Sequence, residues 1–131
     1  VQTCALPIFK RVNDEHGHAI GDQVLVVLAS LLRDHTRASD LVVRLGGEEF
    51  LLVLPDTGAQ RAYDVCERLR LCVAEHPWQA VSPGLAVTLS VGLTTAPPYD
   101  AQALSLRADA ALYRAKAAGR NRLVQEFVVQ E

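Results

Sequence analysis

One stretch, residues 44–50, constrains this chain more than any other. It reads Arg-Leu-Gly-Gly-Glu-Glu-Phe and lies between two apolar runs, residues 41–43 and 50–54. Apolar runs that flank a Gly-Gly pair predict a β-hairpin, because glycine adopts the positive φ angles that tight hairpin turns require. The chain is therefore expected to contain a hairpin that carries carboxylates at its bend.

Glu48 and Glu49 are the two adjacent acids at this predicted bend. Carboxylate oxygens suit a hard cation, and paired glycines allow another molecule to approach the backbone closely. A nucleotide with its magnesium ion is therefore a natural ligand. The alternative is an ordinary hairpin tip whose acids face solvent. The hairpin residues alone favour this ordinary tip, and only the rest of the chain decides between the two interpretations.

The composition is that of one globular domain. A chain of 131 residues, with 50% hydrophobic and 21% charged residues, can bury a full core. The net charge of −2 argues against a surface for nucleic acid or anionic lipid, so phosphate binding is expected to be local. No apolar run is long enough to span a bilayer, and the N-terminus lacks the basic region and apolar core that a signal peptide needs. We expect a cytoplasmic domain without direct membrane contact, which leaves open a membrane-bound parent protein.

Cysteine and histidine residues do not form the pattern of a metal site. Cys4, Cys66 and Cys72 form no CxxC or Cys/His cluster, which disfavours a disulfide framework and a zinc site and fits a reducing compartment. His16 and His18 are metal ligands by residue type. Their polar surroundings instead favour side chains that face solvent or brace a loop. Cys66 falls on the apolar face of a predicted helix, so we expect it in the core.

The hydrophobic periodicity predicts the order strand, helix, two hairpin strands, helix, strand, helix and strand. This order implies a mixed sheet covered by helices. Before the hairpin, the expected elements are a strand at residues 4–9, a polar loop or helical turn at 10–21, and a helix from the N-cap Asp22 to about residue 36. After the hairpin, a helix is expected from a Thr57–Gln60 capping box to His76-Pro77, followed by a strand at 85–93. The last two expected elements are a helix at about 101–118, stopped by Gly119, and a strand at about 122–128.

Several motifs resemble, in order and spacing, those of the diguanylate cyclase family, which carries a GG(D/E)EF signature at such a hairpin. Beside residues 44–50, they occupy residues 9–14, 16–18, 21–22, 90–92 and 108–122. The resemblance implies that residues 9–131 form a GGDEF domain. It also implies an α+β fold, with a mainly antiparallel central sheet of about five strands flanked by helices, similar to adenylyl cyclases and polymerase palm domains and built on a ferredoxin-like core.

The resemblance further implies a reaction. Two GTP molecules, one held by each domain of a transient homodimer, are joined when each ribose 3′-hydroxyl attacks the α-phosphorus of the other. The products are cyclic di-GMP and two pyrophosphates. Magnesium is the implied cofactor, with manganese as an alternative, because metal ions neutralise phosphate charge in such transfers. A sensory domain fused to this one is expected in the full-length protein.

The residues at the hairpin take their implied roles from this family. Gly46 and Gly47 would let the backbone approach the nucleotide phosphates. Glu48 would be a catalytic magnesium ligand, and Glu49 would be a further ligand or would help to deprotonate the hydroxyl. The backbone carbonyl of Leu6 would complete the metal site from the first strand.

Four more positions match the substrate-binding residues of the family. Asn13 and Asp22 match positions that read guanine, and their alternatives are a turn residue and a plain N-cap. Lys116 and Arg120 match positions that contact the triphosphate. Lys116 alternatively offsets the dipole at the end of its helix.

A second implied site would bind the product. Arg37 and Asp40 form an RxxD motif five residues before Gly46, at the distance where the family places an inhibitory cyclic di-GMP site. An arginine can contact phosphate or guanine with two hydrogen bonds, and an aspartate can accept one from a base. Arg68 is expected to add a contact. The alternative for such an Arg-Asp pair is surface decoration.

Residues 1–8 depart from the family pattern. Family members usually carry Asp-Ile-Asp where this chain has Ala5, Leu6 and Pro7, and the first Asp is a metal ligand. Alanine cannot coordinate magnesium, so we expect poor activity. The alternative function is a catalytically degenerate module that binds GTP or cyclic di-GMP for regulation.

The departure ends abruptly at Ile8, whereas natural decay would scatter changes along the chain. We therefore hypothesise that residues 1–8 are foreign, since Ala-Leu-Pro-Ile is the translation of a common sequencing-adapter end. Resequencing the source locus is expected to reveal other codons at positions 5–7. Finding the codons for Ala5 and Pro7 in genomic DNA would instead establish degeneration.

Overall fold

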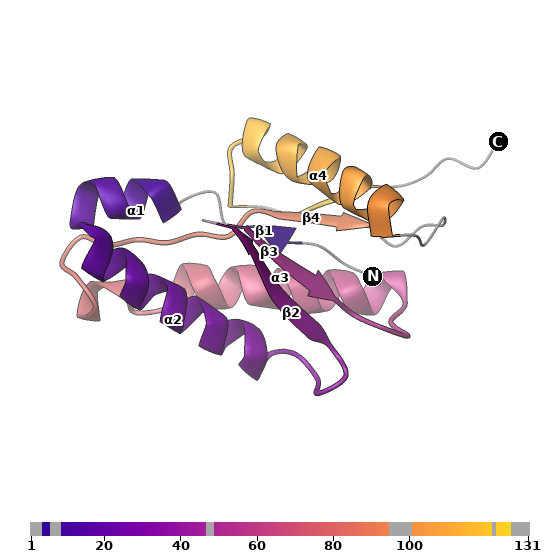
Figure 1. The fold of residues 1–131 in the computed structure, drawn as a ribbon, viewed down its shortest axis with the longest axis horizontal. Helices are drawn as coiled ribbons and strands as arrows, with labels where there is room; N and C mark the ends of the chain where they lie inside the picture. Colours follow the sequence, from indigo (N-terminus) through magenta and orange to yellow (C-terminus); the bar gives the residue numbers. More distant parts are fainter. Residues whose placement is uncertain (1–3, 6–8, 47–48, 95–100, 122, 127–131) are drawn as a thin grey trace.

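The structure is a computed structural model that describes residues 4–5, 9–46, 49–94, 101–121 and 123–126. Helices and strands alternate along this part of the chain (Figure 1). Their order is β1 (Cys4–Ala5), α1 (Phe9–His16), α2 (His18–Asp34), β2 (Leu41–Gly46), β3 (Glu49–Val53), α3 (Ala59–Glu75), a 3-10 helix (Trp78–Ala80), β4 (Val91–Thr94), α4 (Ala101–Ala117) and β5 (Leu123–Glu126).

The strands form two ladders. An antiparallel ladder has the order β1-β3-β2, and a parallel ladder joins β4 to β5. The parallel pairing follows from α4, because a helical crossover returns the chain to the same end of the sheet. β1 contacts both β3 and β4, so the two ladders meet at β1. The expected α+β fold of about five strands with a mainly antiparallel sheet is confirmed, and the pairing refines it.

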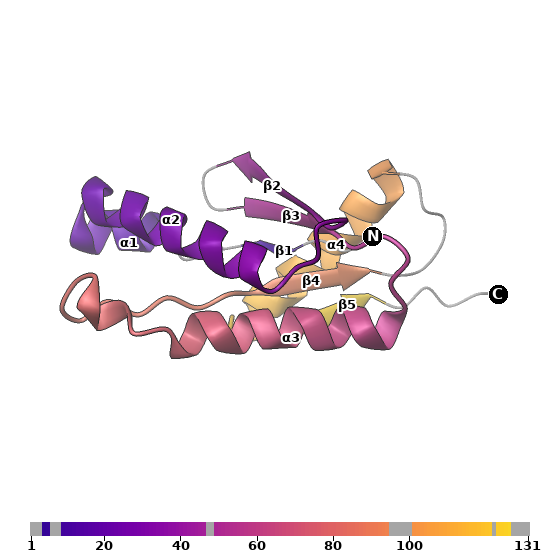
Figure 2. The ribbon, with the colours of Figure 1, turned by 90° about the horizontal axis from the view of Figure 1, so that it is seen from below.

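Helices cover both faces of the strands. α4 packs on β4 and β5, whereas α3 contacts β4 and β5 and also packs against α2. Figure 1 shows α4 on one side of β4 and α3 on the other, and Figure 2 shows α2 and α3 along the strands from a second direction. The helices therefore bury the strands from two sides, as the expected sheet covered by helices requires.

The buried face of each helix follows its sequence period. In α2 the buried residues recur every three or four positions, and Val26 on the opposite face is 71% exposed. Cys66 is 1% exposed on the buried face of α3, which confirms its place in the core. Together with the strands, these faces form one core whose largest fully buried side chains are Leu28, Leu32, Leu52, Leu54, Leu69, Leu89, Leu93, Val24 and Val73.

The expected first strand and polar loop are wrong in their bounds. Phe9, the expected last residue of the strand, begins α1, and residues 10–21 are almost entirely helical, whereas residues 6–8 lie outside the described residues. Gly17 alone separates α1 from α2, because its φ of 88° lies in the left-handed region that a glycine adopts without strain. The apolar periodicity did not predict this pair of helices, because both helices leave much of their surface exposed at this end of the molecule and their sequence is polar.

The other predicted boundaries differ locally. α3 begins at Ala59 after Gly58, which offers no side-chain cap, so the Thr57–Gln60 capping box is wrong. The Thr57 hydroxyl instead donates to the Pro55 carbonyl at 2.9 Å. Residues 85–89 keep the predicted alternation of burial but form no strand, and only residues 91–94 belong to β4. α2 and α4 end within two residues of the expected positions.

None of the described helices is both long and apolar enough to cross a membrane.

Candidate functional site

The predicted hairpin is present as β2 and β3. Gly46 pairs with Glu49 at the end of this ladder. The register shifts between Arg44 and Gly46, and such a bulge re-aims a strand next to its turn. Gly47 and Glu48 lie outside the described residues, so their implied roles stay predictions, as does the side-chain role of Glu49.

The first strand meets the hairpin at the predicted place. β1 pairs with β3 so that Ala5 stands directly opposite Glu49 and Cys4 opposite Phe50. Residues that face each other in an antiparallel pair share one face of the sheet and lie close together. Position 5 is therefore the cross-strand neighbour of a predicted metal ligand, and the chain places an alanine there. Leu6 lies outside the described residues.

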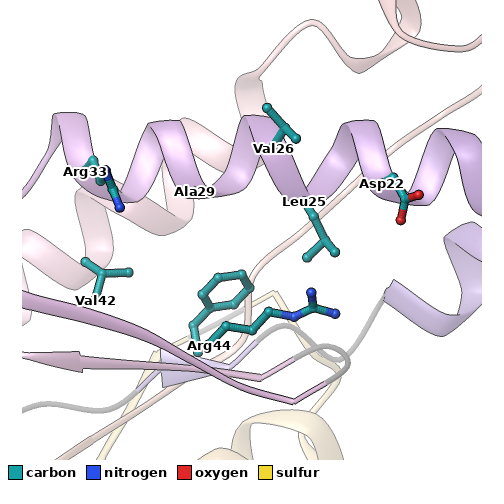
Figure 3. Close-up of a pocket in the computed structure, with 8 residues that line it drawn as sticks. Asp22, Leu25, Val26, Ala29, Arg33, Val42 and Arg44 are labelled. Carbon is teal, nitrogen blue, oxygen red and sulfur yellow. The ribbon is translucent and has the colours of Figure 1, made fainter.

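A cleft of about 480 Å³ runs between α2 and the hairpin strands. Leu25 and Phe50 contribute apolar surface, while Asp22, Arg33 and Arg44 contribute charge. Figure 3 shows the Arg44 side chain extending along the cleft toward the end where Asp22 lies, with Arg33 near the other end. An apolar wall with a few convergent charged groups is the usual form of a small-molecule site. This cleft can hold a planar base against apolar surface and an anion beside a guanidinium.

Arg33 and Arg44 were missed as site residues by the sequence analysis. Arg44 belongs to the hairpin motif, and the signal that could have found it is the apolar pattern of β2. Arg44 interrupts that pattern two residues before Gly46. The motif does not indicate that its side chain lines a cleft against α2.

Asp22 does not cap a helix. α2 begins at His18 with Gly17 as its N-cap, so Asp22 lies in the second turn, exposed and at the edge of the cleft. The N-cap alternative is therefore wrong. The implied role in reading guanine loses its main competitor, since no structural task of α2 accounts for a carboxylate at this position.

Asn13 lies in α1 and is not a turn residue. Its amide oxygen Oδ1 is buried and has no hydrogen-bond partner among the described residues. Such an acceptor is rare in a native structure and calls for an explanation, for which a ligand is one candidate. Asn13 is not among the residues that line the cleft between α2 and the hairpin.

Lys116 and Arg120 lie at the carboxyl end of α4. Arg120 donates its amide to Ala115 O at 2.9 Å and Gly119 donates to Lys116 O at 3.3 Å, which is the Schellman arrangement. Gly119 thus stops the helix as predicted. Figures 1 and 2 both show α4 ending toward the end of the molecule where β2 passes into β3. Neither residue lines the cleft, and the dipole alternative for Lys116, in the last turn, remains open.

Arg37 and Asp40 lie together at a second hollow, of about 460 Å³. Asp40 accepts from the Arg37 amide at 2.7 Å and from Arg37 Nη2 at 3.2 Å. The same Nη2 donates to Pro55 O at 3.0 Å and to Thr57 Oγ1 at 2.7 Å. The pair therefore braces the turn before β2 against the end of β3. Arg68 is exposed on α3 and is not among the residues that line this hollow.

The histidines brace the fold. His16 Nδ1 lies 3.1 Å from Ser82 Oγ and ties α1 to the loop after the 3-10 helix, while His18 is exposed. The structure also brings His35 Nε2 to 3.2 Å from Cys72 Sγ, a pair that the sequence spacing did not indicate. Within the described ranges, no three His, Cys, Asp or Glu side chains gather as a metal site.

Replacing Asp22 tests its position in α2. Asp22→Ala is expected to change the free energy of unfolding in urea by no more than about 0.5 kcal/mol, because Asp22 caps nothing. Asp40→Ala, which removes an acceptor of two hydrogen bonds, is the contrasting variant and is expected to cost about 1 kcal/mol. A loss of about 1 kcal/mol from Asp22→Ala would restore the capping role.

Comparison with known proteins agrees with this geometry. The family model described as diguanylate cyclase, GGDEF domain, matches residues 1–122. Diguanylate cyclase DgcP of Pseudomonas aeruginosa is 45% identical over 116 residues, which are 88% of this chain and 17% of that protein. The chain spans between about a sixth and a third of the length of the curated relatives it matches.

Solved structures show the same relationship. The active GGEEF domain of a diguanylate cyclase from Vibrio cholerae has a TM-score of 0.87 at 33% identity, with 97% of this chain and 81% of that chain covered. The GGDEF domain of DgcB from Caulobacter crescentus, in complex with c-di-GMP, has a TM-score of 0.84 at 31% identity, with 94% and 74% covered. The family match, the sequence identity and the fold agree, and this chain belongs to the GGDEF domain family of diguanylate cyclases.

Proposed function

We propose that this chain is a diguanylate cyclase domain that binds GTP beside the hairpin and condenses two GTP into cyclic di-GMP and two pyrophosphates. The observation that carries the proposal is the cleft between α2 and the hairpin strands, with Asp22 and Arg44 on its walls. Its charges suit the two ends of a nucleotide. Asp22 can accept hydrogen bonds from a guanine edge, whereas a guanidinium can pair with phosphate. The proposal places the domain in the cytoplasm, where GTP is available.

Each proposed residue has a defined task. Asn13 and Asp22 hold the base, and Gly46 and Gly47 allow the phosphates to approach the backbone. Lys116 and Arg120 hold the triphosphate from the end of α4. With the nucleotide fixed, the 3′-oxygen of one GTP forms a bond to the α-phosphorus of the other, and the bond from that phosphorus to the pyrophosphate oxygen breaks. Glu49 is the proposed acceptor of the hydroxyl proton.

The reaction requires two copies of the domain. One domain holds one GTP, so two domains must face each other before the two half-reactions can occur. We therefore propose a transient homodimer, brought together in the full-length protein by a fused sensory domain. Because neither GTP reacts within its own domain, the rate is expected to depend on how this second domain controls pairing.

The proposed metal site fits magnesium only in part. Glu48, Glu49 and the Leu6 carbonyl offer oxygen donors of the right type, with manganese as an alternative ion. The register opposite Glu49 places Ala5 where a third carboxylate is needed. A bound ion would neutralise phosphate charge, and a donor set short of one carboxylate holds it weakly. Loss of a supporting metal contact costs roughly 10 to 100-fold, so loss of a direct ligand should cost at least as much.

Restoring carboxylates on the first strand tests this account. The chain as it stands is expected to form cyclic di-GMP from GTP and magnesium at least about 100-fold more slowly than the double variant Ala5→Asp with Pro7→Asp. Chromatographic quantification of the product over time measures both rates. The variant Pro7→Asp alone is the control, since it leaves position 5 without a ligand.

The alternative function is a regulatory module that binds GTP or cyclic di-GMP without making product. It is favoured specifically by Ala5, because binding of the base and the phosphates does not need that position. Absence of product from both the chain and its double variant, with cyclic di-GMP still bound, would establish the module and overturn the cyclase. A pure dimerisation scaffold is weaker, because it gives Asp22, Arg44 and the orphaned Asn13 amide no task.

We further propose that the hollow at Arg37 and Asp40 binds cyclic di-GMP and restrains the enzyme. Arg37 uses Nη2 for its bonds within the protein, whereas its Nε and Nη1 make no hydrogen bond to described residues. Nε and Nη1 lie on different edges of the guanidinium, so each can donate a separate hydrogen bond to a phosphate or a guanine. Product bound here would hold the domains in an unproductive arrangement, with Arg68 as an additional contact.

Product binding at this hollow is tested by Arg37→Ala. The dissociation constant for cyclic di-GMP, measured by titration calorimetry, is expected to rise at least tenfold, because the charge and the two donors of the guanidinium are lost. The affinity for GTP is expected to stay unchanged. Arg61→Ala, which removes an exposed charge at the start of α3, is the control. Unaltered affinity for cyclic di-GMP in a folded Arg37→Ala protein would exclude this hollow as the product site.

A further inference from the structure

Four polar side chains form a cluster that has no role in the function proposed above. Two of them lie on α3, one lies before β4 and one lies after α4. Arg70 on α3 forms a bidentate ion pair with Glu67, one turn earlier. Its Nε donates to both carboxylate oxygens of Glu67 at 3.0 Å, and its Nη2 donates to Oε1. The side chain of Arg70 is 16% exposed and that of Glu67 is 29% exposed. The remaining donor of Arg70, Nη1, reaches residue 121, which is 51 positions away in the sequence.

The contact of Arg70 is to the turn that follows α4. Arg70 Nη1 donates to the backbone carbonyl of Asn121 at 3.2 Å and to its side-chain Oδ1 at 3.0 Å. The amide of Asn121 donates to Ser90 Oγ at 3.1 Å, and Ser90 is fully buried before β4. Residue 121 is thus held at its amide, its carbonyl and its side chain by two other elements of the fold.

The turn needs such support because its backbone is unusual. Gly119 has a φ of 122°, Arg120 of 61° and Asn121 of 44°. Glycine adopts positive φ freely and asparagine tolerates it, but for Arg120 the left-handed region is unfavourable. Strained backbone of this kind persists only where its surroundings hold it, and it gathers at functional sites. Here the strained residues include Arg120, which is a proposed triphosphate contact. Arg120 directly precedes Asn121, the residue to which Arg70 donates.

We infer that Arg70, oriented by Glu67, is a positioning residue that fixes the left-handed turn after α4 and thereby sets where Arg120 and Lys116 meet the triphosphate of GTP. The inference rests on the proposed function, since it assigns the turn a ligand. Arg70 touches no substrate in this scheme and acts through Asn121 and the backbone. Glu67 restricts the rotation of the guanidinium, because it binds the edge formed by Nε and Nη2. Nη1 is then directed to Asn121.

The hydrogen bond with Glu67 raises the pKa of Arg70 above its ordinary value, against a smaller lowering by burial. The guanidinium of Arg70 therefore stays charged over physiological pH. The groups that face it from the packed elements are Glu67, Tyr63 and Asn121.

The test compares ligands that do and do not carry a triphosphate. Arg70→Ala is expected to weaken GTP binding roughly tenfold in titration calorimetry and to leave the affinity for GMP unchanged, because only the β- and γ-phosphates need the turn. Arg70→Lys keeps the charge but lacks the forked geometry, and its affinity for GTP is expected to lie between those of the parent and Arg70→Ala. Arg61→Ala on the same helix is the charge-matched control and should bind as the parent does.

A second variant separates positioning from a general loss of structure. Asn121→Gly in the Arg70→Ala background is expected to recover part of the GTP affinity, since glycine takes up positive φ without a clamp. Equal weakening of GTP and GMP, unaltered GTP affinity in Arg70→Ala, or no recovery by Asn121→Gly would each overturn the inference.

A measurement without nucleotide keeps the two proposals apart. The Asn121 amide, bonded to Ser90, is expected to exchange its hydrogen with solvent at least about tenfold faster in Arg70→Ala than in the parent. An unchanged exchange rate would overturn the clamp whether or not the domain binds GTP. If exchange accelerates but the parent itself binds no GTP, the proposed function fails, and with it the role of the clamp in positioning a triphosphate.

Discussion

The register of β3 is the constraint on which the rest of the site depends. β3 pairs with β2 on one side and with β1 on the other. The first pairing sets the length of the turn between Gly46 and Glu49, and the second sets which residue of the first strand stands opposite Glu49. A shift of either pairing by one residue would turn every side chain of that strand to the opposite face. The buried Phe50 and Leu52 prevent this shift, because they must face the core.

Much of the fold could be predicted from periodicity. The helical stripes of α2 and α3, the glycine that ends α4 and the apolar runs of the hairpin each depend on local rules that the tertiary structure does not override. The failures came where polar sequence is helical. Residues 9–16 carry too few apolar positions to indicate a helix, and α1 packs through the buried Val12 while Asp14 and Glu15 are exposed.

The site could be predicted only in its short-range part. The hairpin motif, Asp22 and the Arg37–Asp40 pair were visible because each depends on neighbours in the sequence. The roles of Arg44, Arg33 and Arg70 depend on which elements meet, and no local pattern encodes that meeting. Arg70 is the clearest case: a surface-like Glu67–Arg70 pair at helical spacing is common, and only the contact with Asn121 distinguishes it from decoration.

The pairing of Ala5 with Glu49 has a consequence for how such domains evolve. A β-ladder is held by backbone amides and carbonyls, which are the same for alanine and aspartate, so the strand can exchange one for the other without losing its partner. Selection on the scaffold and selection on the chemistry therefore act on different atoms of the same residue. After gene duplication, one substitution could silence one copy and leave its nucleotide and product sites in place. A family built this way would readily give rise to receptors that share the architecture of its enzymes.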